Sequence, residues 1–327
     1  MRFWKSREFG TAAVLLAMLL GCEIATRVNL GESFLVEGWG PSGRFLRIFE
    51  DAAPIGLAAI GACLVILSGG VDLSSGSVMG LASVALAAAV GREGWAPALG
   101  LLAAFAAGTA AGGVNGVLVG YLRLPPFIAT LGLMSVARGV SYWLSPQRIP
   151  IEKASPLFTV LGAHSVWVLA GATALGSLLL ARTSGGRYVY AIGGNEEAAR
   201  FSGLPIPAIK TAIYATAGLC AALGGGALAL RYGSGYVELG RGYELQIIAA
   251  CAVGGVSFSG GEGSILGAVL GAVTLQVLEI LLITLKVQAD YIQIAYGAAI
   301  ILAVAVDQLR HGSVVGRWIG RLRRKTA

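Results

Sequence analysis

The feature that most constrains this chain is a succession of apolar segments, each close to the length of a membrane span. A helix that crosses the bilayer core needs about 20 mostly apolar residues, so about ten such segments would occupy most of the chain. Of the 327 residues, 56% are hydrophobic and only 13% are charged, too few charges to cover a soluble fold. We therefore predict an all-α fold, a polytopic transmembrane helical bundle whose outer surface contacts lipid. The predicted spans are 10–28, 52–68, 76–91, 96–119, 126–145, 162–181, 209–230, 243–257, 263–285 and 290–307.

Connections between these spans are short, so we interpret residues 1–327 as a single transmembrane domain. The segments 76–91 and 243–257 are the shortest, and each fits either a full span or a partial, re-entrant helix. The stretch Val28–Phe49 is expected to be a sizeable connection on the side of the membrane opposite the termini.

Charge predicts the orientation. About ten spans place both termini on the same side, and more lysines and arginines fall on that side than on the other. Because basic residues are retained on the inner side, both termini are predicted to be cytoplasmic. The net charge of +7, including the basic tail Trp318–Ala327, is then interpreted as contact with the lipid surface and not with nucleic acid.

Cysteine and histidine usage predicts no bound metal or cofactor. Cys22, Cys63, Cys220 and Cys251 lie inside apolar runs without paired spacing, so we expect reduced packing residues. The two histidines are far apart in the sequence. The residues before Cys22 are similar to a lipoprotein cleavage site, but a first membrane span accounts for the same run.

Glycines recur at helical spacing within two spans. Four-residue spacing places them on one face of a helix, where they allow close backbone packing in a membrane. The expected stripes are Gly108, Gly112, Gly116 and Gly120, and Gly263, Gly267 and Gly271.

A first polar interruption, Ser68–Ser77, separates two apolar runs. Glycine permits unusual backbone angles, and serine or aspartate can begin a helix. A broken helix beside a translocation path and a plain turn outside the membrane are both compatible with it. Its candidate residues are Gly69, Gly70, Asp72, Ser74 and Gly76.

A second interruption covers about residues 183–208 and is predicted to be cytoplasmic. Asn195 can cap a short helix whose first turn carries acidic residues, as the helix dipole favours. A charged helix held between two spans suits a docking element, and a solvated loop without a partner is the alternative. The candidate residues are Gly194, Asn195, Glu196, Glu197, Arg200 and Gly203.

A third interruption, Gly254–Gly263, is rich in glycine but lacks the Lys-Ser/Thr of a nucleotide-binding loop, and no strand is predicted before it. No G-x-x-x-x-G-K-[ST] motif occurs, so we predict a chain that is not an enzyme. Polar residues inside spans are costly in lipid and suggest either structural pairing or a path. These are Asn115, Arg138, Glu244 and Glu279, whereas Asp290 and Asp307 are expected at span ends.

The interruptions also carry a family resemblance. In order, the chain contains SGGVDLSSGSVMGL, NGVLVGYLRLPPFIATLGLMSVARG, GRYVYAIGGNEEAARFSGLP and GYELQIIAACAVGGVSFSGGEGSILGAVLGA. This series resembles the membrane permeases of bacterial ribose- and xylose-type ABC sugar importers, from about residue 55 to 309. Where relatives more often have Thr-Ser after the two glycines of the last motif, this chain has Val256-Ser257.

The resemblance implies a dimeric helical permease in the bacterial inner membrane, as a homodimer or a related heterodimer. It implies a cytoplasmic ATP-binding subunit and a periplasmic solute-binding protein as partners. Gly194–Gly203 matches the segment that couples to the ATPase, and Gly69–Gly76 the broken region beside the path. Phe127, Ala129 and Thr130 match a signature that we assign to packing.

The function expected from this resemblance is monosaccharide import by alternating access. Permeation of a nucleoside or branched-chain amino acid within the same superfamily is the alternative. A secondary transporter driven by an ion gradient is the rival from outside it.

Overall fold

The computed structural model describes residues 7–30, 32–35, 44–151, 157–158, 161 and 165–310, and most of them are helical, as predicted. The helices are α1 (Arg7–Leu30), α3 (Arg44–Leu67), α4 (Ser75–Ala87), α5 (Pro97–Gly120), α6 (Pro126–Leu144), α8 (Ser165–Arg182), α9 (Ser184–Gly194), α10 (Glu196–Phe201), α11 (Ile206–Tyr232), α12 (Tyr243–Val253), α13 (Ile265–Thr284) and α14 (Ala289–Arg310). A π-helical turn, η2 (Ala88–Arg92), extends α4. Two short strands, β1 (Ile149–Pro150) and β2 (Ser234–Gly235), pair antiparallel.

Every predicted span corresponds to a helix, but the helices are not equally long. Eight helical segments of the described chain are long and apolar enough to cross a membrane, and Tyr243–Val253 and Tyr291–Leu302 are shorter. The segment predicted at 76–91 continues through η2 and is full length. In contrast, α12 has 11 residues, a rise of about 16 Å, roughly half of the bilayer core. Thus α12 is a partial helix.

The connection after the first span is shorter than predicted. Helix α1 continues to Leu30 and α3 begins at Arg44, so both ends of the stretch Val28–Phe49 are helical. The predicted span began later than α3 because the first turns of this helix carry charged residues. These turns are nevertheless held in the bundle, since Asp51 forms an ion pair with Arg231 of α11.

The glycine stripe of α5 forms close backbone contacts, as predicted, and the helix it contacts is α11. A Cβ at Gly108 would lie 2.5 Å from the carbonyl oxygen of Gly218, and one at Gly120 would lie 2.7 Å from that of Pro207. Real Cβ atoms do not approach carbonyl oxygens this closely, so the two helices require glycine along this line.

The second predicted stripe is only partly helical. Gly267 on α13 packs tightly on Gly254 after α12. Gly263, however, precedes the helix with φ +141°. The side chain of Ser264 accepts a hydrogen bond from the Gly267 amide and begins α13 there, so the four-residue spacing extends beyond the helix.

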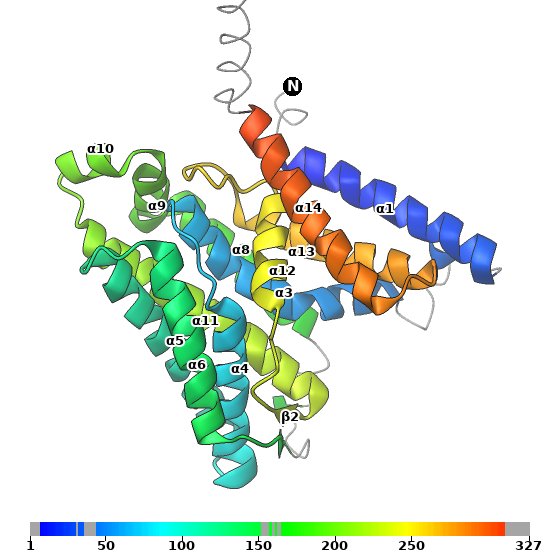
Figure 1. The fold of residues 1–327 in the computed structure, drawn as a ribbon, viewed down its shortest axis with the longest axis horizontal. Coiled ribbons are helices and arrows are strands. Elements are labelled where there is room, and N and C mark those ends of the chain that lie inside the picture. The colour runs from blue at the N-terminus through cyan, green and yellow to red at the C-terminus, as the bar shows by residue number, and fades with distance from the viewer. Residues whose placement is uncertain are drawn as a thin grey trace, which may run out of the picture.

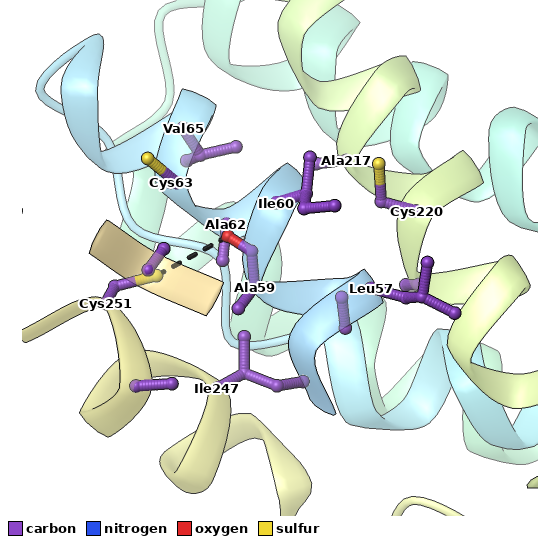
Figure 2. Packing of buried hydrophobic residues seen from close by; sticks show 14 of the residues in the cluster. Leu57, Ala59, Ile60, Ala62, Cys63, Val65, Ala217, Cys220, Ile247 and Cys251 are labelled. Carbon is purple, nitrogen blue, oxygen red and sulfur yellow. Dashed lines mark hydrogen bonds between the residues drawn. The ribbon is translucent and has the colours of Figure 1, made fainter. Parts of the chain in front are cut away.

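Helix α3 lies at the centre of the largest core cluster, between α11 and α12 (Figure 2). The Cys251 thiol donates to the Ala59 carbonyl oxygen at 3.6 Å, and Figure 2 shows Cys63 and Cys220 among the same side chains. All four cysteines are free and buried, which confirms their prediction as packing residues. The histidines and the basic C-terminal tail lie outside the described residues.

Candidate functional site

The first interruption begins with a glycine turn at the end of α3. Gly69 has φ +81°, and the Gly70 amide donates to the Val65 carbonyl oxygen at 3.0 Å. This pattern ends a helix with a left-handed residue, a conformation that favours glycine. The chain then continues without helical structure to Ser74, which precedes the first residue of α4.

Buried polar groups hold the non-helical segment. The Asp72 carboxylate accepts hydrogen bonds from the amide and the hydroxyl of Ser74, at 2.8 and 2.6 Å. Asn115 of α5 donates to the Ser74 hydroxyl at 2.9 Å, and the Leu73 amide donates to the Thr130 hydroxyl of α6 at 3.2 Å. Helices α5 and α6 therefore fix the path of this segment, and Asn115 provides the contact from α5.

Burial distinguishes the two interpretations of this interruption. Asp72 is 5% exposed and Ser74 is 1% exposed, and within Ser68–Ser77 only Gly69 is classed as exposed. A plain surface turn would leave these polar groups to solvent. The segment instead behaves as irregular backbone buried in protein, which favours the broken helix.

The second interruption contains the predicted short helix, α10, and a second helix, α9, that the sequence did not predict. The Asn195 side chain accepts a hydrogen bond from the Ala198 amide at 2.9 Å and caps α10 as expected. Gly203, at φ +81°, follows the helix. Helix α9 was missed because glycines at both of its ends disfavour a helix. Val189 and Ile192 nevertheless share one buried face, and Thr183 caps the helix with a bond of 3.2 Å from the Gly186 amide.

Glu196 links α10 to α11. Its carboxylate accepts from Arg200 at 3.0 Å and from Lys210 of α11 at 2.7 Å. Burial alone would raise the pKa of Glu196, but Lys210 and then Arg200 outweigh it and hold that pKa below its usual value. The ion pair of Glu196 with Lys210 therefore fixes the first turn of α10 onto the bundle. Glu197, in contrast, is exposed.

The end of α3 and the second and third interruptions meet at one point, which we call the backbone junction and define by Leu67, Gly193 and Gly261. The Gly261 amide donates to the Leu67 carbonyl oxygen at 2.9 Å. A Cβ at Gly193 would collide with that carbonyl oxygen and lie 2.5 Å from the Gly261 nitrogen. Figure 1 shows α9 beside the turn between α12 and α13. The end of α3, the last turn of α9 and the third interruption are thus in direct contact.

A side-chain bond reinforces the junction. The Tyr190 hydroxyl of α9 donates to the Gly263 carbonyl oxygen at 2.8 Å. Gly260 and Gly261 have φ of +82° and +72°, so the turn needs glycine for its conformation as well as for close approach. The third interruption is therefore a packing surface for α9.

Two predicted intramembrane residues form an ion pair. Arg138 of α6 contacts Glu244 of α12 at 3.2 Å, with 32% and 13% of the side chains exposed. The other carboxylate oxygen of Glu244 lies against Gly76 in the first turn of α4 and has no hydrogen-bond partner among the described residues. Glu244 therefore joins α6, α12 and the segment that follows the broken helix.

Glu279 is remote from this pair. It accepts a hydrogen bond from the Tyr296 hydroxyl at 2.8 Å and lies 3.5 Å from Gln276. Its contacts are those of a structural link between α13 and α14. The side chains of Asp290 and Asp307 lie outside the described part of the chain.

The sequence does not predict a neighbouring network, because its members belong to separate segments. Tyr142 of α6 and Arg241 both donate to Glu238, each at 2.7 Å. These bonds hold the pKa of Glu238 below its usual value. No spacing in the sequence relates residue 142 to residue 238.

A bundle of apolar helices with a buried polar break and a short charged helix on its surface defines a multi-pass membrane protein of the transport class. The sequence from 44 to 304 matches the family described as branched-chain amino acid transport system / permease component, and the chain belongs to that family. It is a transport subunit.

Similar proteins cover most of its length. The fructose import permease protein FrcC of Rhizobium meliloti is 33% identical over 91% of this chain and 85% of that protein. The ribose import permease protein RbsC of Escherichia coli is 38% identical, over 80% and 84% of the two chains. The galactose/methyl galactoside import permease protein MglC of Haemophilus influenzae is 36% identical, over 82% and 87%. No solved structure matches the chain.

Proposed function

We propose that this chain is the membrane permease of an ABC importer and moves a monosaccharide across the bacterial inner membrane. The observation that carries the proposal is the backbone junction. Only two residues, Gly194 and Asn195, separate α10 from Gly193, which contacts the end of α3 directly. A displacement of α10 would therefore be transmitted through backbone atoms and not through flexible side chains.

The substrate class follows from the relatives. Their names specify fructose, ribose and galactose import. The family description supports a branched-chain amino acid as the second candidate. Next to Asp72 and Ser74, the buried hydroxyls of Ser75 and Ser77 have no hydrogen-bond partner among the described residues, and such groups suit a polyol better than an aliphatic side chain.

The proposed assembly has a separate ATP-binding subunit beneath α10, a solute-binding protein on the opposite side, and a second permease copy. Residues 1–327 would form one transmembrane domain with both termini in the cytoplasm, and about 183–208 would form the coupling segment. Gly194, Asn195, Glu196, Glu197, Arg200 and Gly203 would contact or shape the ATPase-facing surface.

The proposed mechanism is alternating access. Closure of the ATPases on ATP would shift α10, and the backbone junction would pass the shift to Leu67 and the turn before α13. The segment containing Gly69, Gly70, Asp72, Ser74 and Gly76 would then change which face of the bundle is open. The ion pair of Arg138 with Glu244 would hold α12 against α6 in one of the two states.

Co-purification with a candidate ATPase tests the docking step. We expect wild type to capture the ATPase in detergent and a Glu196→Ala/Arg200→Ala variant to lose most of it. The matched control is Arg92→Ala/Glu93→Ala. These residues form a comparable exposed ion pair, 2.9 Å between Nε and Oε1, and they are not part of α10. If both variants capture the ATPase equally well, α10 is not part of the interface.

Flux measurements separate the proposal from an ion-driven carrier. Vesicles with the permease and the ATPase should take up a labelled monosaccharide with the binding protein present, and only with ATP. Uptake without any ATPase, driven by an ion gradient, would favour the carrier.

A further inference from the structure

A cavity of about 370 Å³ lies where α5 ends and where α6 and α11 begin. Its walls come from the last turn of α5, the turn between α5 and α6, helix α10 and the first turns of α6 and α11. Helices α5, α6 and α11 are all candidate membrane spans, so the cavity lies at the level where a bilayer changes from acyl chains to headgroups. This placement holds for either orientation of the protein.

The cavity is basic. Arg123, Arg200 and Lys210 line it together with one carboxylate, Glu196. Glu196 is already bonded to Arg200 and Lys210, at 3.0 and 2.7 Å. Arg123 makes no ion pair within the part of the chain that the structure describes. An excess of positive charge therefore remains, and it favours an anion.

Arg123 stands in an unfavourable backbone conformation. Its φ is +55°, in the left-handed region that favours glycine. The turn around it is fixed, since the Leu122 amide donates to the Val117 carbonyl oxygen at 3.2 Å and the Leu124 amide to that of Leu118 at 3.0 Å. The fixed turn places an arginine at the cavity where a glycine would be less strained.

Two helix starts add to the positive potential. Pro125 and Pro205 precede α6 and α11, and neither provides a side-chain cap. Both helices begin at the cavity wall, at Pro126 and Ile206. The amino end of a helix carries a partial positive charge that stabilises a nearby anion.

The rim is apolar. Tyr121, Leu122, Phe127 and Ile128 are 57–63% exposed around the same turn. Exposed aromatic and aliphatic side chains at the ends of spans are typical of contact with the membrane interface. A soluble anion would leave this rim uncovered, whereas the acyl chains of a lipid would cover it.

We propose that this cavity binds the headgroup phosphate of an anionic phospholipid, with Arg123 as the principal contact and the exposed face of the α5–α6 turn against its acyl chains. The proposal does not depend on the ATPase-coupled function, because it requires only that the helix ends lie at the membrane interface. It assigns a role to Arg123, which the docking of α10 does not use.

Lipid binding to the full-length purified protein tests this proposal. Native mass spectrometry after titration with phosphatidylglycerol, and separately with phosphatidylcholine, measures how many lipids remain bound. We expect wild type to retain phosphatidylglycerol preferentially. Arg123→Gln should weaken that retention about fivefold, the effect of one basic residue at an anionic surface.

Two further variants make the result specific. Arg187→Gln removes one exposed positive charge at the same end of the molecule but outside the cavity, and it should leave retention unchanged. Arg123→Gly should weaken retention as Arg123→Gln does, while its thermal unfolding midpoint stays at or above that of wild type, because glycine suits φ +55°. Loss of binding without loss of folding then assigns the effect to the side chain.

Several results would overturn the proposal. One is equal retention of both lipids, and another is equal weakening by Arg187→Gln. Displacement of the bound lipid by millimolar inorganic phosphate would indicate a site for a soluble anion. Weaker ATPase capture by Arg123→Gln with unchanged lipid retention would assign the cavity to an acidic segment of that partner.

Discussion

At the scale of single residues, Gly193 is the glycine of the backbone junction with the least space for a side chain. We expect Gly193→Ala to lower the free energy of unfolding by about 1–3 kcal/mol, as overpacking does, because its Cβ would collide with the Leu67 carbonyl oxygen. Thermal unfolding in detergent and sugar uptake in vesicles measure the two consequences.

The control is a glycine outside every proposed site. Gly171 of α8 has no atom within 4 Å of an added Cβ, so Gly171→Ala should behave as wild type in both assays. If the two alanine variants behave alike, the backbone junction does not constrain the bundle.

Arg138 tests the partly buried ion pair at the same scale. Arg138→Leu leaves the Glu244 carboxylate, 13% exposed, without its partner, and we expect a loss of about 2 kcal/mol in unfolding free energy. Adding Glu244→Leu should recover part of the loss, since no unpaired charge then remains. Arg241→Gln, at a pair where Arg241 is 69% exposed, should change stability little. A double variant less stable than Arg138→Leu would contradict this account.

At the scale of elements, α10 is too short to be stable without its cap and its contact with α11. Asn195→Ala removes the hydrogen bond to the Ala198 amide and should cost about 1 kcal/mol of local helix stability. Hydrogen exchange of the α10 amides and capture of the ATPase should both report the change. Asn195→Asp keeps an acceptor in place and should restore both, so failure of this rescue would mean that the cap is not the cause.

At the scale of the whole molecule, orientation is open to a direct test. The four native cysteines are buried, so they give little background to a membrane-impermeant thiol reagent. In intact spheroplasts we expect labelling of Glu93→Cys, which is exposed between η2 and α5, and no labelling of Gly185→Cys until the membrane is permeabilised. The reverse pattern would place the termini outside the cytoplasm.

Much of the fold was predictable because span length and glycine spacing are local properties. The α5 stripe, the cap at Asn195 and the short length of the segment near residue 243 all follow from neighbours along the chain. Helix α9 and the early start of α3 were not predicted, since glycine at the ends of α9 and charged residues in the first turns of α3 disfavour a membrane span, and contacts with other helices stabilise both.

The candidate site was predicted as separate pieces. Asp72, Asn115, Arg138 and Glu244 each stand out as polar groups among apolar residues, and membrane solvation makes such groups costly wherever they occur. Their partners were not predictable, because Ser74 and Asn115, or Arg138 and Glu244, are far apart in the chain and meet only after helices pack.

The sequence by itself determined that the chain is a multi-pass membrane protein with polar breaks, because the bilayer imposes length and hydropathy on every span separately. Only the tertiary structure decided that two of the breaks meet the end of α3 at Leu67, Gly193 and Gly261, and that Arg123 lines a cavity shared with α10. The reason is that such contacts arise from close packing between distant backbones, and local sequence patterns carry no information about which distant segments become neighbours.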